Sequence, residues 1–320
     1  MTALSSASDP HSNRSKGMFV TILGNNSALP AYGRHPTAQA VTVHGHDILL
    51  DCGEGTLMQM QAYGIRWARI NHIFISHLHG DHYFGIFGLL TSMSLFGRVA
   101  PLHLHAPAAL EGLIQNMLAM AQTFLCFPYH FHPLPEGDGL LVDEKEFSVS
   151  CFPVAHRIPC HGFLVSEKTK GRRLLPEKAE AYEVPVSFYQ NLKAGEDFVT
   201  PGGKVIQNEW VTEPGPQPLR YAYTADTVFT ESFLPYIAGV DALYHESTYL
   251  SDNEEKALAR FHSTARQAAV IAQKANVGQL LLGHYSSRYQ EVAAFEQEAK
   301  AVFERATATV EGGVYEIKGL

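Results

Sequence analysis

Three histidines and one aspartate fall within six residues of this chain, in the segment His77-Leu78-His79-Gly80-Asp81-His82. Imidazole nitrogens and carboxylate oxygens are the usual ligands of zinc, and a zinc site that keeps one coordination position open can hold a water molecule. A segment this rich in both ligand types can surround two metal ions. The spacing therefore predicts a metal centre that holds water.

An HxH pair is weak evidence when it stands alone. On a strand, both histidines of such a pair point to the same face of the sheet and commonly belong to ordinary surface or core. Only the pair at 77 and 79 is followed by an aspartate and a fourth ligand. The other pairs are His44/His46, His103/His105 and His130/His132.

The elements around this segment indicate how it is positioned. Patterns typical of strands occur at residues 18–23, 38–43, 47–51, 72–76, 147–154, 220–224, 242–245 and 279–283. Helical patterns occur at residues 56–63, 83–96, 108–124, 264–275 and 291–305. This order, loosely repeated in two halves, predicts an α/β fold with two packed sheets and helices outside, although periodicity alone fits other α/β layouts too.

Three more candidate ligands stand at the ends of predicted strands, namely His156 in PVAH, Asp226 in YTADT and His284 in LLLGH. With HxHxDH, this series resembles the metallo-β-lactamase superfamily. The resemblance implies the metallo-β-lactamase fold, an αββα four-layer sandwich that binds two zinc ions (Zn2+) per chain. It implies that one zinc is held by His77, His79 and His156, that the other is held by Asp81, His82 and His284, and that Asp226 bridges them.

Asp51, in LLDCGEGT, matches the first motif of the same superfamily. There the resemblance implies that the carboxylate supports the ligand loop from behind, and such outer partners fix the tautomer and orientation of ligating histidines. The alternative is an aspartate that only begins a turn before Gly53.

Four segments carry a closer resemblance within the superfamily, namely HLHGDHYFGIFGLL at 77–90, HEST at 245–248, FHST at 261–264 and HYSSRY at 284–289. With these segments the chain resembles the ribonuclease Z family, which trims the 3′ ends of precursor tRNA. The similarity covers nearly all of residues 18–315, and the departures, such as Asn25 and Ala225, spare every inferred ligand.

The resemblance implies a zinc-dependent endoribonuclease that leaves a 3′-hydroxyl on the tRNA and a 5′-phosphate on the trailer. Asp81 is then both ligand and general base. His245 is our candidate proton donor, because imidazole titrates near neutrality; alternatively, His245 only closes a strand. Arg288 is a candidate phosphate ligand through its forked donors, and a salt bridge is the alternative.

Residues 167–215 interrupt the pattern of the domain, which we expect to span residues 18–320. The resemblance implies that this insertion is an exosite arm that grips tRNA, whereas the simpler alternative is a solvated basic loop. Phosphate neutralisation is plausible where positive charge concentrates. The basic residues are Lys168, Lys170, Arg172 and Arg173.

The overall composition narrows the function further. A net charge of −8 means that any RNA contact must be local. No apolar run approaches the ~20 residues of a membrane helix, and residues 1–17 predict a flexible tail without a secretory signal, so we expect a cytoplasmic protein. The family resemblance also implies a homodimer. Two rival functions remain: a small-molecule phosphodiesterase or related hydrolase of the same fold, and a catalytically silent RNA-binding scaffold.

Overall fold

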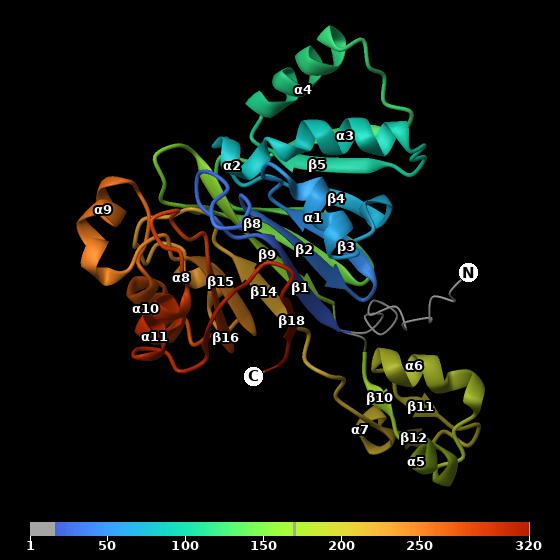
Figure 1. The fold of residues 1–320 in the computed structure, drawn as a ribbon. Helices are drawn as coiled ribbons and strands as arrows, with labels where there is room; N and C mark the ends of the chain where they lie inside the picture. Colours follow the sequence, from blue (N-terminus) through green and yellow to red (C-terminus); the bar gives the residue numbers. More distant parts are fainter. Residues whose placement is uncertain (1–16, 169–170, 320) are drawn as a thin grey trace, which may run out of the picture. The chain divides into compact units, whose positions relative to one another are not determined.

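The computed structural model describes residues 17–168 and 171–319, which fall into two compact units (Figure 1). The larger unit runs to Ser166 and resumes at Leu219, and the smaller one is Glu167–Pro218. The tail predicted at 1–17 lies outside the described residues except for Gly17, and so does Lys170. None of the described helices combines the length and hydropathy needed to cross a bilayer.

The first sheet of the larger unit has seven strands in the order β18-β1-β2-β3-β4-β5-β6. The strands β18 to β3 pair antiparallel, and β3 to β6 pair parallel. Both faces of the central strands are buried, which explains their near-continuous apolar runs. The bounds are β1 (Met18–Gly24), β2 (Ala38–Val43), β3 (His46–Leu50), β4 (Ile70–Phe74), β5 (Leu102–Ala106), β6 (Tyr129–Pro133) and β18 (Val314–Ile317).

The second sheet also has seven strands, in the order β17-β16-β15-β14-β9-β8-β7. The strands β14 to β17 pair parallel, whereas β9 pairs antiparallel with β14 and β7 pairs antiparallel with β8. The bounds are β7 (Gly139–Asp143), β8 (Phe147–Val154), β9 (Cys160–Glu167), β14 (Arg220–Tyr223), β15 (Ala242–Glu246), β16 (Gln279–Gly283) and β17 (Ala306–Ala308).

The two sheets pack face to face and helices cover both outer faces, which confirms the predicted αββα sandwich. Val20 and Phe74 of the first sheet share one core cluster with Phe163 and Tyr221 of the second. In Figure 1, α1 and α3 lie on one side of the sheets and α10 and α11 on the other. The first helical layer contains α1 (Thr56–Ala62), η1 (Trp67–Arg69), α2 (Gly80–Tyr83), α3 (Gly85–Leu95) and α4 (Ala109–Met120). The second half adds α8 (Leu234–Ile237), η3 (Ser251–Asn253), α9 (Glu254–Ala259), α10 (Ala265–Lys274) and α11 (Ala293–Lys300).

The smaller unit has its own core, although its sequence shows little periodicity. Val184, Leu192, Ile206 and Val211 are buried together with Ala179. Two short antiparallel pairs, β10–β13 and β11–β12, complete it. Its elements are β10 (Arg173–Leu174), α5 (Pro176–Ala181), η2 (Val186–Phe188), α6 (Tyr189–Ala194), β11 (Phe198–Val199), β12 (Val205–Ile206), α7 (Asn208–Val211) and β13 (Thr212–Glu213).

Candidate metal centre

The candidate ligands all follow strand ends. The loop after β4 carries His77 and His79, and α2 carries Asp81 and His82; Asp226 follows β14 and His284 follows β16 directly. Glycine is required where the loop after β3 meets the start of α3. A Cβ atom on Gly85 would lie 2.1 Å from the carbonyl oxygen of Gly53, so only glycine allows these two backbones to approach this closely.

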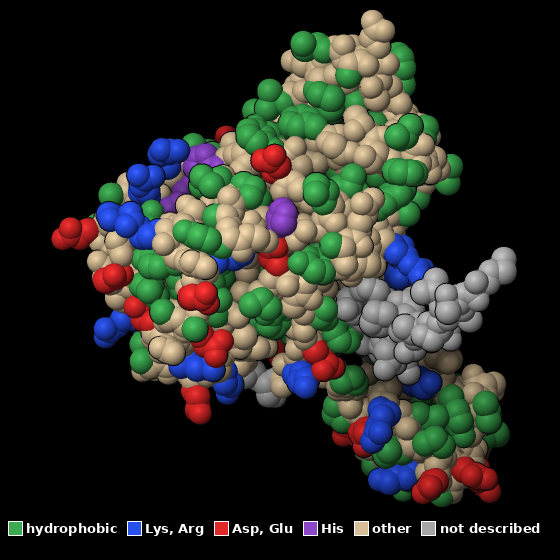
Figure 2. All heavy atoms as spheres, viewed as in Figure 1, with side chains coloured by type: hydrophobic (Ala, Val, Ile, Leu, Met, Phe, Trp, Pro, Cys, Tyr) green, Lys and Arg blue, Asp and Glu red, His purple; other side chains and the backbone are tan. Residues whose placement is uncertain are grey.

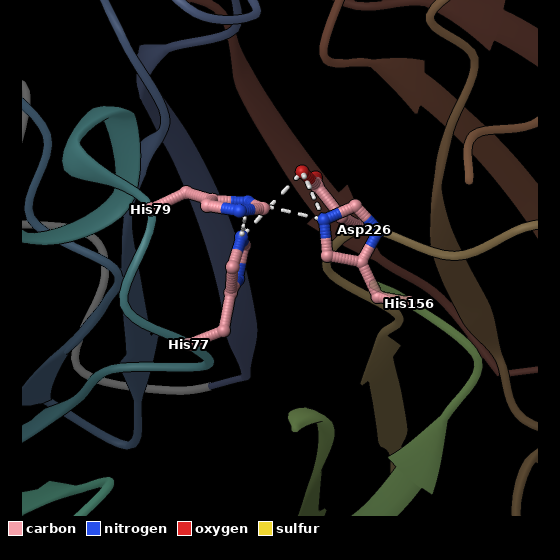
Figure 3. A group of neighbouring side chains, drawn as sticks. All are labelled: His77, His79, His156 and Asp226. Atoms are coloured by element: carbon pink, nitrogen blue, oxygen red, sulfur yellow. Dashed lines mark hydrogen bonds and ion pairs between the residues drawn. The ribbon is translucent and has the colours of Figure 1, made fainter. Parts of the chain in front are cut away.

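The first ligand group consists of three imidazoles and one carboxylate (Figure 3). His79 Nδ1 lies 3.1 Å from His77 Nε2 and 3.1 Å from His156 Nε2. Asp226 Oδ2 lies 3.6 Å from His77 Nε2 and 3.9 Å from His156 Nε2. Figure 3 shows the four side chains pointing toward one another, two from each side of the site.

The second ligand group shares Asp226 with the first. Asp226 Oδ1 lies 3.2 Å from His284 Nε2 and 3.4 Å from His82 Nε2. Asp81 Oδ2 lies 3.5 Å from His284 Nε2 and 3.8 Å from His82 Nε2. One oxygen of Asp226 therefore faces each group, which is the arrangement of a bridging carboxylate.

The outer hydrogen bonds leave the inner nitrogens free to bind a metal. His82 Nδ1 lies 2.7 Å from Asp51 Oδ2, and His156 Nδ1 lies 2.9 Å from the carbonyl oxygen of Phe261. Both partners can only accept, so each Nδ1 carries a proton, and the neutral ring turns the lone pair of its Nε2 toward the site. Outer partners of this kind are the usual support of a metal site.

Two hydroxyl groups fix the tautomers of His77 and His284 in the same way. Ser76 Oγ donates to Asp51 and therefore accepts from His77 Nδ1 at 3.0 Å. Thr248 Oγ1 donates to Glu246 and therefore accepts from His284 Nδ1 at 2.9 Å. Asp226 Oδ1 is buried without a hydrogen-bond partner, and an uncompensated buried carboxylate oxygen is costly unless a cation balances it. The residues thus fit a divalent metal centre.

Asp51 lies behind the ligand loop and contacts His82 Nδ1. It accepts hydrogen bonds from the Ser76 backbone NH at 2.8 Å and from the Tyr223 hydroxyl at 2.5 Å, in addition to His82. Its side chain is fully buried. Asp51 thereby connects the ligand loop of the first sheet to a strand of the second.

His245 does not reach the site, so the proton donor that we expect from the sequence alone must be reassigned. Its side chain is fully buried in β15, where Nδ1 donates to the Glu246 carbonyl and the ring lies 5.9 Å from Phe233. Neighbouring strand residues face opposite sides of a sheet. Because Glu246 faces the ligands, His245 faces the helical layer.

His262, an imidazole outside the two expected ligand sets, lines the pocket instead. Its Nδ1 lies 2.8 Å from Glu246 Oε1, and its side chain is 13% exposed. Burial lowers the pKa of His262, but the charges of Glu246 and Asp226 outweigh that effect and raise it to about 9. Thr264, two residues after His262, is the N-cap of α10 and forms a capping box with Gln267. This capping box holds the segment that carries His262 in place. The FHST segment contained this residue, but the sequence alone gave it no role.

A pocket of about 620 Å³ opens above the ligands. His79, Asp81, His156, Asp226 and His262 line it, and Arg157 and Arg260 stand at its wall. Arg260 also lines a neighbouring hollow with Lys256 and Arg288. Arg288 therefore lies beside the pocket and not inside it.

The basic residues of the insertion belong to the smaller unit and are partly engaged there. Arg173 forms an ion pair with Glu213, and Arg172 Nε donates to Thr212 Oγ1 at 2.6 Å. Lys168 is half-buried. Arg172 and Arg173 therefore belong to a compact unit other than the one that contains the ligands.

Comparisons with known proteins agree with this architecture. The family model of anti-Pycsar protein Apyc1 matches residues 18–163. A ribonuclease Z of Parabacteroides distasonis is 44% identical over 285 residues, which are 89% of this chain and 94% of that protein. A ribonuclease Z of Bacteroides fragilis is 41% identical over 283 residues, covering 88% and 93%.

Solved structures show the same fold. The short form of human tRNase Z has a TM-score of 0.68 and 26% identity, covering 94% of this chain and 99% of that chain. The metallo-β-lactamase fold protein YhfI of Bacillus subtilis has a TM-score of 0.68 at 20% identity, covering 93% and 98%. The fold and the site define a metal-dependent hydrolase of the metallo-β-lactamase fold. From its identity to relatives along nearly their whole length, the chain belongs to the ribonuclease Z family.

Proposed function

We propose that this chain is an endoribonuclease that removes the 3′ trailer of precursor tRNA, leaving a 3′-hydroxyl on the tRNA and a 5′-phosphate on the trailer. The main support is the position of Asp226, whose two carboxylate oxygens face two groups of imidazoles at the base of a pocket. The chain also belongs to the ribonuclease Z family. A complete set of ligands argues against a catalytically silent scaffold.

We propose zinc as the metal, with two ions per chain, because imidazole and carboxylate are its preferred ligands. His77, His79 and His156 would hold one ion, Asp81, His82 and His284 the other, and Asp226 both. When bound, the pair would supply charge stabilisation to the phosphodiester during in-line displacement.

The side chains of the chain itself handle the protons. Asp81 lines the pocket and would take the proton of the attacking water, and the Ala28 backbone NH, which donates to Asp81 Oδ2 at 2.7 Å, keeps that carboxylate in place. His262 would give a proton to the leaving 3′ oxygen. Glu246 orients the ring of His262 through its Nδ1, so Nε2 is left for the substrate.

The net charge of −8 disfavours contact with RNA phosphates, so RNA binding requires a local group of cations. Arg157 and Arg260 at the pocket, with Lys256 and Arg288 in the adjoining hollow, provide positive charge where an RNA backbone would enter. We also propose that the chain acts in the cytoplasm.

Removal of the smaller unit should separate a tRNA enzyme from a small-molecule phosphodiesterase. Ser166 and Arg220 are direct partners across β9 and β14, so an Asn-Gly turn can replace residues 167–219. We expect KM for precursor tRNA to rise about tenfold or more and its salt dependence to flatten, because phosphate contacts are lost. Hydrolysis of bis(p-nitrophenyl) phosphate should stay within about twofold of the parent rate, since so small a substrate needs no phosphate contacts outside the pocket.

A charge-matched pair of variants controls for the deletion. Lys168, Lys170 and Arg173 changed together to Gln should reproduce the rise in KM, whereas the same change at Lys178, Lys193 and Lys204 of the same unit should not. Equal losses of activity on both substrates after the deletion would mean that the unit supports the fold. If the deletion lowered activity on neither substrate, the smaller unit would not be an exosite for tRNA.

We propose a homodimer through the ends of α3 and α4. Leu95, Phe96, Val99, Met120 and Phe124 are each at least 64% exposed, and Ser94 Oγ, which accepts from the Cys126 backbone NH, ties the two segments together. Figure 2 shows hydrophobic side chains with little charge over this part of the molecule. Contiguous exposed apolar surface of this kind marks an interaction site.

Sedimentation equilibrium of the full chain should therefore give the mass of two chains. Leu95→Asp combined with Met120→Asp should give one chain, whereas Leu258→Asp, at an exposed leucine of α9, should leave the mass unchanged. A parent protein that sediments as a monomer at micromolar concentration would contradict this interface.

A further inference from the structure

Five histidines lie together on the first sheet, outside the candidate metal centre. His72 pairs with His103 and His103 with His130 in one row across β4, β5 and β6, while His105 pairs with His132 in the next row. All five face the second sheet, because Phe74, in the same row as His105, belongs to the core between the sheets. We refer to these five residues as the histidine grid.

The rings of the grid are stacked and their nitrogens approach in two pairs. His103 Nδ1 lies 2.9 Å from His132 Nε2, and His72 Nδ1 lies 3.4 Å from His105 Nε2. The ring centroids of His103 and His132 are 5.2 Å apart, at an interplanar angle of 18°. His103 and His132 are half-buried, so both are open to an ion from solvent.

His103 and His132 favour the uncharged imidazole, which is the form that binds metals. Burial, followed by the charges of neighbouring imidazoles, lowers the pKa of His105 to about 3 and also lowers the pKa values of His103 and His132. Charged imidazoles this close would repel one another, which favours the neutral form of His103, His105 and His132.

The distance between the two nitrogens suits one class of ion. Two ligands at right angles, each about 2.0 Å from a metal, are about 2.8 Å apart, which is the spacing in square-planar Cu2+ and Ni2+ sites. A hydrogen bond between the two rings would give a similar distance. A proton and a metal ion compete for the lone pair of the same imidazole nitrogen. Among the divalent first-row ions, Cu2+ binds such nitrogens most strongly and therefore competes best.

We propose that His103 and His132 form an accessory site for one imidazole-preferring divalent transition metal ion, distinct from the catalytic pair. The two rings supply adjacent ligands from neighbouring strands, and water completes the shell. The rigid parallel pairing of β5 and β6 fixes the two Cα positions, so binding requires little rearrangement.

One equivalent of Cu2+ added to the zinc-loaded full chain tests the site. Electron paramagnetic resonance should show coupling to two imidazole nitrogens while the zinc content stays unchanged. His132→Gln should weaken Cu2+ binding at least tenfold by calorimetry. His130→Gln, an exposed histidine on the same strand, should bind within twofold of the parent.

Three results would overturn the proposal: a copper spectrum without nitrogen coupling, release of zinc in proportion to the copper bound, or undiminished binding by His132→Gln. The copper spectrum of the parent protein tests the site by itself, so the proposal can be refuted even if His132→Gln does not fold. Cleavage activity is measured separately, and its absence would count against the proposed function without affecting this site.

Discussion

Replacement of His284 by Ala should abolish both metal binding and catalysis. His284 Nε2 lies close to both Asp226 and Asp81, so its removal leaves the second group with one imidazole and its carboxylates. Loss of metal-based charge stabilisation is worth several kcal/mol, and we expect kcat to fall by about 10³-fold or more. Elemental analysis of the purified variant and single-turnover cleavage measure the two effects together.

His79→Ala extends this test to the first group. His79 has an ordinary extended backbone with φ −82°, whereas His284 has φ 60°, so alanine strains the chain only at the second position. Both variants should lose metal and activity, and His46→Ala, a histidine outside the site, should lose neither. A variant that keeps its activity after losing metal would refute the assignment of these ligands.

His262→Ala should slow cleavage while the metal content stays at the parent level. His262 lines the pocket and is oriented by Glu246, and loss of a general acid costs about 10²–10⁴-fold. The chemical step, measured in a single turnover at saturating enzyme, should carry the whole effect. KM should change little.

His245→Gln is the matched comparison for the proton donor. His245 is a buried histidine one residue from Glu246, but its ring faces the helical layer. We expect this variant to cleave within about threefold of the parent rate once its folded fraction is taken into account. If His245→Gln slowed the chemical step and His262→Ala did not, the reassignment would be wrong.

Much of the architecture could be predicted because the ligands stand at strand ends. The runs at 18–23, 38–43, 147–154 and 279–283 form β1, β2, β8 and β16 with at most one residue of difference. Both sheets bury two faces, so their central strands carry strong apolar signals. Six strands of the two large sheets were missed, namely β5, β6, β7, β9, β17 and β18, and so were the four short strands β10 to β13 of the smaller unit.

Two of the missed strands, β9 and β18, have partners that are distant in the sequence. β18 pairs with β1 across nearly the whole chain, and nothing in its local sequence indicates that partner. β5 and β6 alternate histidine with apolar residues, so the HxH pairs at 103 and 130 were strand signals. The histidine side chains of these two strands face the second sheet, where apolar residues are usually expected.

The site shows the same division between local and long-range information. The candidate ligand spacing and Asp51 could be read from short motifs. The role of His262 could not be predicted in this way, because it depends on a hydrogen bond to Glu246, which lies sixteen residues earlier in the chain. The period of two along β15 could have excluded His245, since its neighbour Glu246 faces the site.

Cleavage of a precursor tRNA with a defined 3′ trailer is the most direct test of the central claim. The zinc-loaded chain should make one cut on the 3′ side of the acceptor stem, giving a tRNA with a 3′-hydroxyl and a trailer with a 5′-phosphate. A chelator should stop the reaction and added zinc should restore it. An intact precursor under conditions where bis(p-nitrophenyl) phosphate is hydrolysed, or a 2′,3′-cyclic phosphate end, would contradict the account.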